Sequence, residues 1–209
     1  ALFVASLGLI PLLGAEFMIA AAALDQLPPP GPPEVAFAGR SNAGKSSAIN
    51  ALAGRNRLAF ASRTPGRTQQ IVMFGLPSGA IVADLPGYGY AAVPKAVKRV
   101  WQDVLATYVA TRSTLVALVL VVDARHGLKP LDLAMLDGFL PSGRPVMVLA
   151  TKSDKLTRTE SARASAAIRG QLAERYREQA AYVTVVPFSA TARTGLMEAD
   201  AILAGWLAA

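Results

Sequence analysis

The sequence contains no cysteine and a single histidine, His126, among its 209 residues. The absence of cysteine excludes a disulfide framework, a thiolate metal site and a cysteine nucleophile. One histidine excludes a histidine-rich metal cluster and leaves one imidazole for any serine–histidine–aspartate site. Charged residues are scarce too, at 17% against 53% hydrophobic residues, which is typical of a folded domain. The length suits one α/β domain with a sizeable core.

Acidic residues are almost absent between Arg40 and Arg99, where Asp84 is the only one. The basic residues of this stretch are Arg40, Lys45, Arg55, Arg57, Arg63, Arg67, Lys95, Lys98 and Arg99. Nine basic residues against one acidic residue give a charge of +8, which exceeds the +7 of the whole chain. Because this block overlaps the phosphate-type motifs described below, we interpret it as a face for an anionic partner.

Positive charge is also missing from the apolar N-terminal segment, since the first basic residue is Arg40. Residues 1–24 are hydrophobic over a length that could span a bilayer, but two glycines and a proline interrupt them. No basic residue flanks them, so the cues for orientation and for a signal peptide are missing. We therefore predict no membrane role, and expect residues 1–33, with their proline-rich end, to pack on a domain formed by residues 34–209.

Short apolar runs alternate with stretches of helical periodicity. Strands are predicted over residues 34–39, 80–84, 115–122, 146–150 and 182–186. Helices are predicted over residues 47–54, 93–109, 158–180 and 196–207. This alternation predicts a three-layer α/β fold with a mostly parallel sheet of about six strands and helices on both faces. Ligands of such a fold gather at the carboxyl ends of the strands.

The loop after the first predicted strand carries the most specific motif. Residues 39–46 read Gly-Arg-Ser-Asn-Ala-Gly-Lys-Ser and match the P-loop pattern G-x-x-x-x-G-K-[ST] between a strand and a helix. The backbone N–H groups of such a loop and the following helix N-terminus bind phosphate. Lys45 would reach the β- and γ-phosphates of a nucleotide, and the Ser46 hydroxyl would bind Mg²⁺.

Three further motifs follow predicted strand ends. Asp84-Leu-Pro-Gly87 offers a carboxylate that can hold Mg²⁺ through water and an N–H group for a γ-phosphate. Thr151-Lys-Ser-Asp154 offers a carboxylate that can accept from guanine N1–H and N2–H₂ together, which excludes adenine. Ser189-Ala190 can present an N–H group to guanine O6. Each motif alone also suits a solvated loop, but their shared position at strand ends predicts a guanine-nucleotide site.

Thr68 lies in a Pro-Gly loop, where its hydroxyl can close on Mg²⁺ and the γ-phosphate. The predicted metal contacts are thus Ser46 and Thr68, with Asp84 acting through water. The predicted nucleotide contacts are Gly39, Arg40, Ser41, Asn42, Ala43, Gly44, Lys45, Ser46, Ser47, Gly66, Arg67, Thr68, Gln69, Gln70, Asp84, Leu85, Pro86, Gly87, Thr151, Lys152, Ser153, Asp154, Phe188, Ser189 and Ala190. No side chain is a convincing general base, because Tyr88 stands where Ras-like enzymes carry a water-positioning Gln. We therefore predict that Lys45, Thr68 and Gly87 stabilise the charge on the phosphates.

These motifs resemble the bacterial EngB family, within the TrmE-Era-EngA-EngB-septin-like GTPase superfamily. The resemblance is carried by residues 33–47, 64–69, 84–91 and 151–156, and it covers roughly residues 24–207. It implies a P-loop GTPase of the cytoplasm with Mg²⁺ as cofactor, which hydrolyses GTP slowly as a switch in large ribosomal subunit assembly. It also implies a need for the protein in cell division and septation, and a K⁺ ion held beside the phosphates by Asn42. The sequence departs from the family pattern in Thr151-Lys152, where Asn-Lys is commoner.

Two functions remain open at this point. The chain is either a switch enzyme that hydrolyses GTP to leave the ribosomal precursor, or a GTP-gated RNA-binding module with negligible hydrolysis until a ribosomal partner activates it. A P-loop ATPase is a distant third that Thr151–Asp154 argues against. In both main readings the partners are GTP or GDP and the large-subunit precursor or its rRNA, bound by the basic face of a monomer. His126 is expected in a loop or facing rRNA rather than in catalysis.

Overall fold

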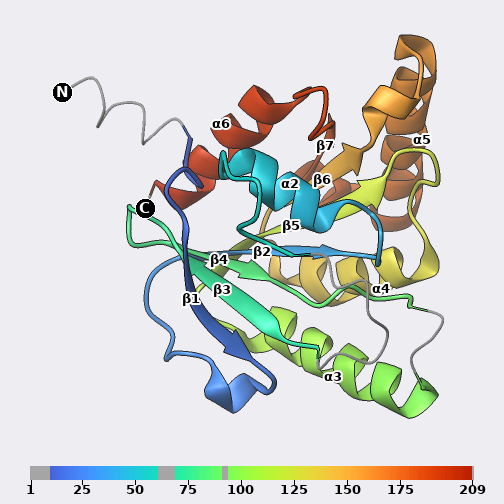
Figure 1. Ribbon diagram of the computed structural model, residues 1–209. Coiled ribbons are helices and arrows are strands. Elements are labelled where there is room, and N and C mark those ends of the chain that lie inside the picture. The colour runs from blue at the N-terminus through green and yellow to red at the C-terminus, as the bar shows by residue number, and fades with distance from the viewer. Residues whose placement is uncertain (1–9, 61–68, 91–93, 209) are drawn as a thin grey trace.

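The computed structural model describes residues 10–60, 69–90 and 94–208 (Figure 1). The strands are β1 Glu16–Ala21, β2 Glu34–Gly39, β3 Ile71–Gly75, β4 Ile81–Asp84, β5 Leu115–Asp123, β6 Val146–Thr151 and β7 Val183–Pro187. The α-helices are α2 Lys45–Leu52, α3 Lys95–Thr111, α4 Pro130–Phe139, α5 Arg158–Tyr176 and α6 Leu196–Leu207. Four short 3₁₀ helices are η1 Leu24–Gln26, η2 Leu140–Ser142, η3 Ser153–Lys155 and η4 Arg177–Tyr182. None of the helices in these described ranges has the length and apolarity that crossing a membrane requires.

The strands form one sheet in the order β1-β3-β4-β2-β5-β6-β7. The five strands from β4 to β7 are parallel to their neighbours, whereas β1 and β3 pair antiparallel at one edge. The mostly parallel three-layer fold is therefore confirmed, with seven strands where about six were predicted. The strands without a predicted range are β3 and β1. Strand β1 lies in the apolar N-terminal segment and pairs Ala21 with Ile71 of β3. Its sequence shows no strict alternation, because it lies at the edge of the sheet and is largely exposed.

Two apolar cores lie between the sheet and its helices, one on each face of the sheet. Helices α3, α4 and α5 bury one core, and α2 and α6 bury the other on the opposite face (Figure 1). Every residue of β2 is buried, as expected of a central strand covered on both faces. The predicted strands occur within one residue of their expected ends because such continuous apolar runs mark buried parallel strands.

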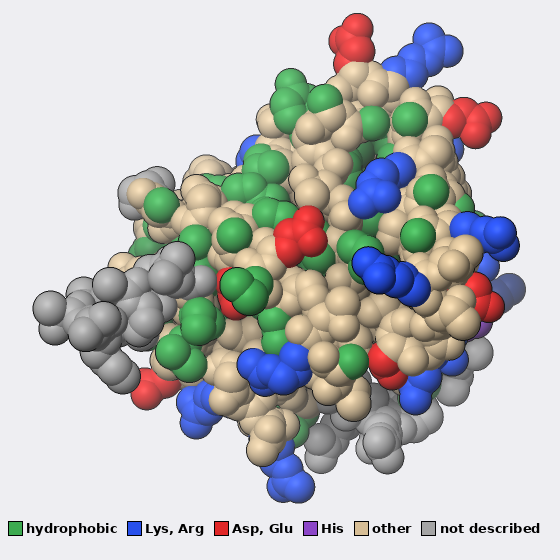
Figure 2. All heavy atoms as spheres, turned by 90° about the horizontal axis from the view of Figure 1, so that it is seen from above, with side chains coloured by type: hydrophobic (Ala, Val, Ile, Leu, Met, Phe, Trp, Pro, Cys, Tyr) green, Lys and Arg blue, Asp and Glu red, His purple; other side chains and the backbone are tan. Residues whose placement is uncertain are grey.

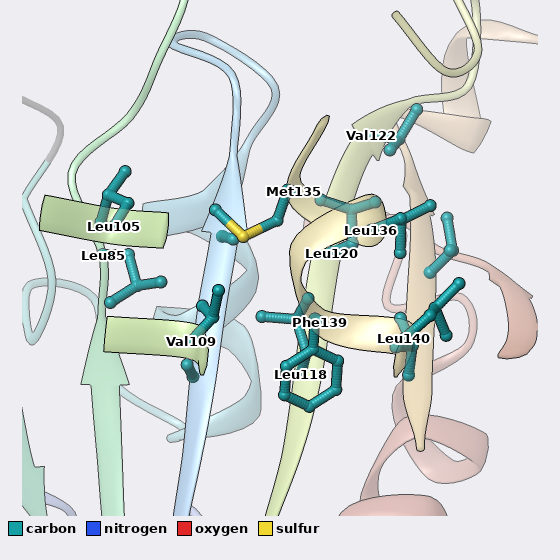
Figure 3. Close-up of a cluster of buried hydrophobic side chains, with 14 of the residues drawn as sticks. Leu85, Leu105, Val109, Leu118, Leu120, Val122, Met135, Leu136, Phe139 and Leu140 are labelled. Carbon is teal, nitrogen blue, oxygen red and sulfur yellow. The ribbon is translucent and has the colours of Figure 1, made fainter. Parts of the chain in front are cut away.

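Helix α4 was absent from the sequence prediction, and it fills the first of these cores. Figure 3 shows Leu136 and Phe139 of α4 packed near Leu118 and Leu120 of β5. Pro130 at the first helical position marks its start. The helix begins directly after the loop that follows β5, so it brings its N-terminus to the edge of the sheet that carries the P-loop.

The basic block is divided between the two faces of the sheet. Arg55 and Arg57 are exposed after α2, whereas Lys95 and Arg99 are exposed on α3, on the other side. Lys45 is largely buried against Asp84, and Arg63 and Arg67 lie outside the described residues. Figure 2 looks onto the molecule from above and shows Lys and Arg side chains spread among other types rather than gathered in one patch. The described members of the block therefore lie in separate basic groups on the two faces of the sheet.

Candidate functional site

The P-loop is built by the end of β2 and the start of α2. Gly39 ends β2, and a Cβ atom there would lie 2.7 Å from the carbonyl oxygen of Val121, so only glycine fits. Asn42 and Gly44 adopt φ angles of 65° and 96°, and Gly44 caps the N-terminus of α2. The chain therefore curls into a loop that ends on the free N–H groups of a helix, which is the arrangement that binds phosphate.

Lys45 and Asp84 meet beside this loop. The Lys45 Nζ donates to Asp84 Oδ1, and each side chain is 11% exposed. Asp84 reaches this position because it ends β4, and parallel pairing places it next to Phe37 of β2. The pair therefore offers a cation for phosphate oxygens and a carboxylate for a metal-bound water at the same edge of the sheet.

The oxygen atoms next to Lys45 are of the kind that bind Mg²⁺. Ser46 supplies a hydroxyl at the start of α2 and Asp84 supplies a carboxylate, and Mg²⁺ prefers oxygen ligands. Among the described residues, no three His, Cys, Asp or Glu side chains form a group that could hold a metal ion. A Mg²⁺ ion here would take most of its ligands from phosphate oxygens and water, as it does in nucleotide sites.

The Asp84–Gly87 segment runs against the P-loop. The Ser41 N–H donates to the Tyr88 carbonyl at 2.8 Å, and the Tyr88 N–H donates to the Gly39 carbonyl at 3.3 Å. A Cβ atom on Gly87 would lie 3.2 Å from Ser41 Oγ. Gly87 thus lies directly beside the loop, where its N–H group can serve a phosphate oxygen.

The Tyr88 side chain is hydrogen-bonded to α4. Its hydroxyl donates to Asp132 Oδ1 at 2.6 Å, and Asp132, only 1% exposed, also accepts from the Lys129 N–H at 2.9 Å. Burial, with a smaller contribution from the Asp132 charge, raises the pKa of Tyr88 well above its ordinary value. Asp132 was missed in the sequence prediction. An acidic residue three positions after Lys129, beside a proline, is a helix-start signal that could have identified it.

The Thr151–Asp154 loop is attached to the P-loop by its first two side chains. Thr151, at the end of β6, donates from Oγ1 to the Ala43 carbonyl and, at 3.1 Å, to the Val122 carbonyl. Lys152 adopts a φ of 58°, and its Nζ donates to the Asn42 carbonyl at 2.6 Å. These bonds fix the distance between the loop predicted to bind phosphate and the loop predicted to bind the base.

Asp154 is oriented by Ser189. The Ser189 hydroxyl donates to Asp154 Oδ1 at 2.8 Å, and this bond lowers the pKa of Asp154 below its ordinary value. The Ser153 N–H donates to the Phe188 carbonyl at 3.1 Å, which ties the loop to the end of β7. An ionised Asp154 accepts hydrogen bonds only, which suits paired N–H donors on a guanine.

The structure brings most of the predicted contacts to one edge of the sheet. Residues 39–47, 84–87, 151–154 and 188–190 all lie at or directly after carboxyl ends of strands. The side chains of Phe188 and Leu85 are buried in the two cores, so only their backbones face the site. Gln69 and Gln70 precede β3, and the predicted contacts Gly66, Arg67 and Thr68 lie outside the described residues.

Comparisons with known proteins agree with this geometry. Residues 34–152 match the family model described as 50S ribosome-binding GTPase. The chain is 53% identical over 193 residues to the probable GTP-binding protein EngB of Azoarcus sp. (strain BH72), which covers 92% of the chain and 91% of that relative. It is 48% identical over 200 residues to the protein of the same description from Bordetella pertussis (strain Tohama I), which covers 92% of the chain and 94% of that relative.

Two solved structures share the fold. A probable GTP-binding protein engB superposes with a TM-score of 0.62 at 23% identity and covers 82% of this chain and 97% of its own. Era in complex with MgGDPNP and nucleotides 1506–1542 of 16S ribosomal RNA gives a TM-score of 0.60 at 20% identity and covers 83% of this chain and 56% of its own. At these identities the structures support the fold alone.

Proposed function

Because the chain belongs to the EngB family of GTP-binding proteins, we propose that it is a slow GTPase that switches conformation during assembly of the large ribosomal subunit. It acts in the cytoplasm as a monomer, with Mg²⁺ as cofactor, and its activity supports cell division and septation. GTP binding favours the ribosome-bound form, and hydrolysis to GDP and phosphate releases it.

One observation carries the guanine-nucleotide part of this proposal. The Lys152 Nζ donates to the Asn42 carbonyl at 2.6 Å, and Thr151 Oγ1 donates to the neighbouring Ala43 carbonyl. The loop with the base-reading carboxylate is therefore hydrogen-bonded directly to the loop with the phosphate-binding N–H groups. A single nucleotide can then contact Asp154 with its guanine while its phosphates lie on Gly44 and Lys45.

Each residue of the site has a distinct role in this proposal. Lys45 and the Gly87 N–H stabilise negative charge on the β- and γ-phosphates. Ser46 and Thr68 would bind Mg²⁺, and Asp84 would hold it through water. The metal neutralises phosphate charge. When Mg²⁺ and phosphate bind, Lys45 exchanges its contact with Asp84 for phosphate oxygens.

The position of Tyr88 supports a slow intrinsic rate. Its hydroxyl is engaged with buried Asp132, so it does not orient a water molecule at the site in the way that a Ras-type Gln does. The same observation supports the second candidate, a GTP-gated RNA-binding module whose hydrolysis needs a ribosomal partner. Asn42, exposed on the P-loop, can add a K⁺ ligand. A higher hydrolysis rate in K⁺ than in Na⁺ is expected if it does, and equal rates would remove the K⁺ site.

Single-turnover hydrolysis with and without purified large ribosomal subunits separates the two candidates. The switch enzyme shows slow but measurable hydrolysis alone, whereas the module shows none until subunits are added. Co-sedimentation with the subunits should be stronger with a non-hydrolysable GTP analogue than with GDP, and Lys45→Ala serves as the nucleotide-free control. Equal sedimentation in both nucleotide states would contradict a switch.

A further inference from the structure

The carboxylate of Asp123 lies at the end of β5, beside the loop predicted to bind the base, and is not among the predicted nucleotide contacts. Strand β5 runs parallel to β6, and the sheet register places Asp123 opposite Thr151 (Figure 1). The Ala124 N–H donates to the Thr151 carbonyl at 2.9 Å. Because Lys152 follows Thr151, the turn after β6 brings the Lys152 side chain next to this carboxylate.

Asp123 and the P-loop hold the Lys152 ammonium group together. Lys152 Nζ lies 3.1 Å from Asp123 Oδ2 and donates to the Asn42 carbonyl at 2.6 Å. The Lys152 side chain is 32% exposed, whereas that of Asp123 is only 10% exposed. A free lysine side chain samples many rotamers, so two fixed acceptors at its end select one path from the end of β6 to the P-loop.

The backbone of Lys152 is constrained as well. Its φ of 58° lies in the left-handed region, which a residue with a Cβ atom adopts at a cost in free energy. Such a conformation persists where the surrounding contacts determine it, and it is frequent at ligand sites. Lys152 is thus fixed both at its backbone and at its ammonium group.

Arg125 makes Asp123 a rigid acceptor. Asp123 Oδ1 accepts from the Arg125 N–H and from Nε, both at 3.0 Å, and Oδ2 accepts from Nη2 at 2.8 Å. Burial acts to raise the pKa of Asp123, but the bonds from Arg125 and Lys152 outweigh it and hold the pKa far below its ordinary value. The carboxylate is therefore ionised at neutral pH and cannot turn away from Lys152.

The path of the Lys152 side chain bears on the base because Asp154 is in the same loop, two residues further on. The methylene groups of a lysine form an apolar surface while the charged end is held elsewhere. With Nζ fixed at the Asn42 carbonyl, these groups run between the loop of the base-reading carboxylate and the P-loop. A flat ring bound to Asp154 would have this apolar surface beside it.

We propose that Asp123 is a positioning residue for the guanine nucleotide: it holds Lys152 so that the methylene groups of the lysine pack on one face of the base. The inference rests on the proposed function, since it takes guanine as the base that Asp154 binds. Asp123 itself does not touch the nucleotide. Its loss would free the lysine side chain and loosen the base end of the site.

Asp123→Asn tests the proposal, with Asp137→Asn as the matched control. Both aspartates accept from an arginine Nη2 at 2.8 Å, but Asp137 lies near the C-terminal end of α4 with Arg175 as its ion-pair partner. By isothermal calorimetry, Asp123→Asn should lower the affinity for GDP and for GTP by about tenfold each, and Asp137→Asn by less than about twofold. Unchanged or higher affinity in Asp123→Asn would overturn the proposal.

A double-mutant cycle with Lys152→Met separates positioning from a purely structural effect. Methionine keeps an apolar side chain but lacks the ammonium group, so Asp123 has no lysine to hold in this background. Asp123→Asn should then change GDP affinity by less than about twofold. A loss of about tenfold in both backgrounds would show that Asp123 acts on the loop after β5 rather than through Lys152, and would overturn the proposal.

Two single variants keep the test decisive if Asp123→Asn does not fold. Lys152→Met alone should lower GDP affinity by about tenfold, and unchanged affinity would overturn the proposal. Arg125→Gln removes the other partner of Asp123 but leaves the carboxylate beside Lys152, so it should lower GDP affinity less than Lys152→Met does. Equal losses in these two variants would assign the effect to the loop after β5 and overturn the positioning role.

Comparison of GDP with ADP distinguishes failure of this inference from failure of the proposed function. Equal affinity of the native protein for GDP and ADP would overturn both, because no guanine would then be read. If the native protein selects GDP while Asp123→Asn and Lys152→Met bind GDP as tightly as it does, the positioning role is wrong and the proposed function stands.

Discussion

Two buried carboxylates on neighbouring strands have opposite surroundings. Glu34, at the start of β2 and 0% exposed, accepts from Arg112 Nε at 2.9 Å, Tyr108 Oη at 3.1 Å and Thr114 Oγ1 at 3.0 Å. Asp84, at the end of β4, has a single described side-chain donor, Lys45. The first lies at the amino ends of the parallel strands and the second at the carboxyl ends.

The difference separates structure from function in this fold. The donors of Glu34 fill its acceptor sites, and Arg112 also donates from Nη1 to the Pro28 carbonyl at 2.8 Å, so the group ties the proline-rich lead-in to the sheet. Such a completed network rigidifies the protein and leaves no room for a ligand. Asp84 and Lys45 keep unused hydrogen-bonding capacity at an edge where the P-loop opens, so both can exchange partners when a nucleotide binds.

Arg112→Ala should have the largest effect on folding. It leaves Glu34 buried without its charge partner, and breaking a buried ion pair in this way costs about 3–5 kcal/mol. Urea unfolding should show this loss in the free energy of unfolding, while the GDP affinity of the folded fraction stays within about twofold. A loss below about 1 kcal/mol would contradict the structural role assigned to the Glu34 group.

Lys45→Ala should show the reverse pattern. We expect GDP and GTP affinity to fall by at least about 100-fold, equivalent to about 2.7 kcal/mol, because the variant lacks the cation at the phosphates. The free energy of unfolding should fall by no more than about 2 kcal/mol, since Asp84 lies at the mouth of the site. Isothermal calorimetry and urea unfolding measure the two quantities. A variant that loses stability but keeps its nucleotide affinity would contradict the functional role assigned to the Lys45–Asp84 pair.

Tyr88→Phe tests whether α4 contributes to the phosphate site. The variant removes the hydroxyl that donates to Asp132 and should lower the free energy of unfolding by about 1–2 kcal/mol. Because Gly87 is then held less firmly, the affinity for a GTP analogue should fall more than the affinity for GDP. Tyr176→Phe is the control, since it removes a hydroxyl bound to the Leu133 carbonyl elsewhere on α4. Equal GTP-to-GDP ratios in both variants would show that Tyr88 does not act on the phosphate site.

Asp200 provides a third carboxylate, whose Oδ1 has no hydrogen-bond partner among the described residues. Burial raises its pKa to about 6, against a small opposing effect of Arg193. The folded state therefore binds a proton more tightly than the unfolded chain, so stability rises as pH falls from about 6 towards 4 and is lost as pH rises through 6.

Because Asp200 is only half-buried, solvent screening limits this effect to about 1 kcal/mol. Urea unfolding between pH 4 and 7, read as the difference between the native protein and Asp200→Asn, isolates its contribution. Identical pH profiles of the two proteins would show that Asp200 is not perturbed.

The sequence predicted the phosphate end of the molecule better than the opposite end. Gly39, Lys45 and Asp154 follow buried strands, and a P-loop or a strand-end carboxylate depends on local spacing that one chain displays directly. The Glu34 network joins residues up to 80 positions apart, so no local pattern reveals it.

Strand β1 lacks a strong local signal, whereas the missed helix α4 has one at its start, in Pro130 and Asp132. Strand β1 is an edge strand with an irregular register between Phe17 and Ile19, and an edge strand shows neither strict alternation nor a long buried run. The cap that Asp132 provides to the Lys129 N–H is local, but its bond from Tyr88, 44 positions earlier in the chain, forms only in the folded protein. The division of the basic block follows from the crossovers that send α2 and α3 to opposite faces, which net charge along the chain does not report.

The most direct test of the account measures nucleotide selectivity. Fluorescence titration of the native protein with GDP, GTP and ATP is compared with titration of Asp154→Asn with guanine and xanthine nucleotides. The account predicts guanine selectivity in the native protein and a shift towards xanthine in Asp154→Asn, because the amide presents a donor where xanthine carries an oxygen. Equal binding of ATP and GTP by the native protein would contradict a guanine-reading Asp154 and leave only the phosphate loop supported.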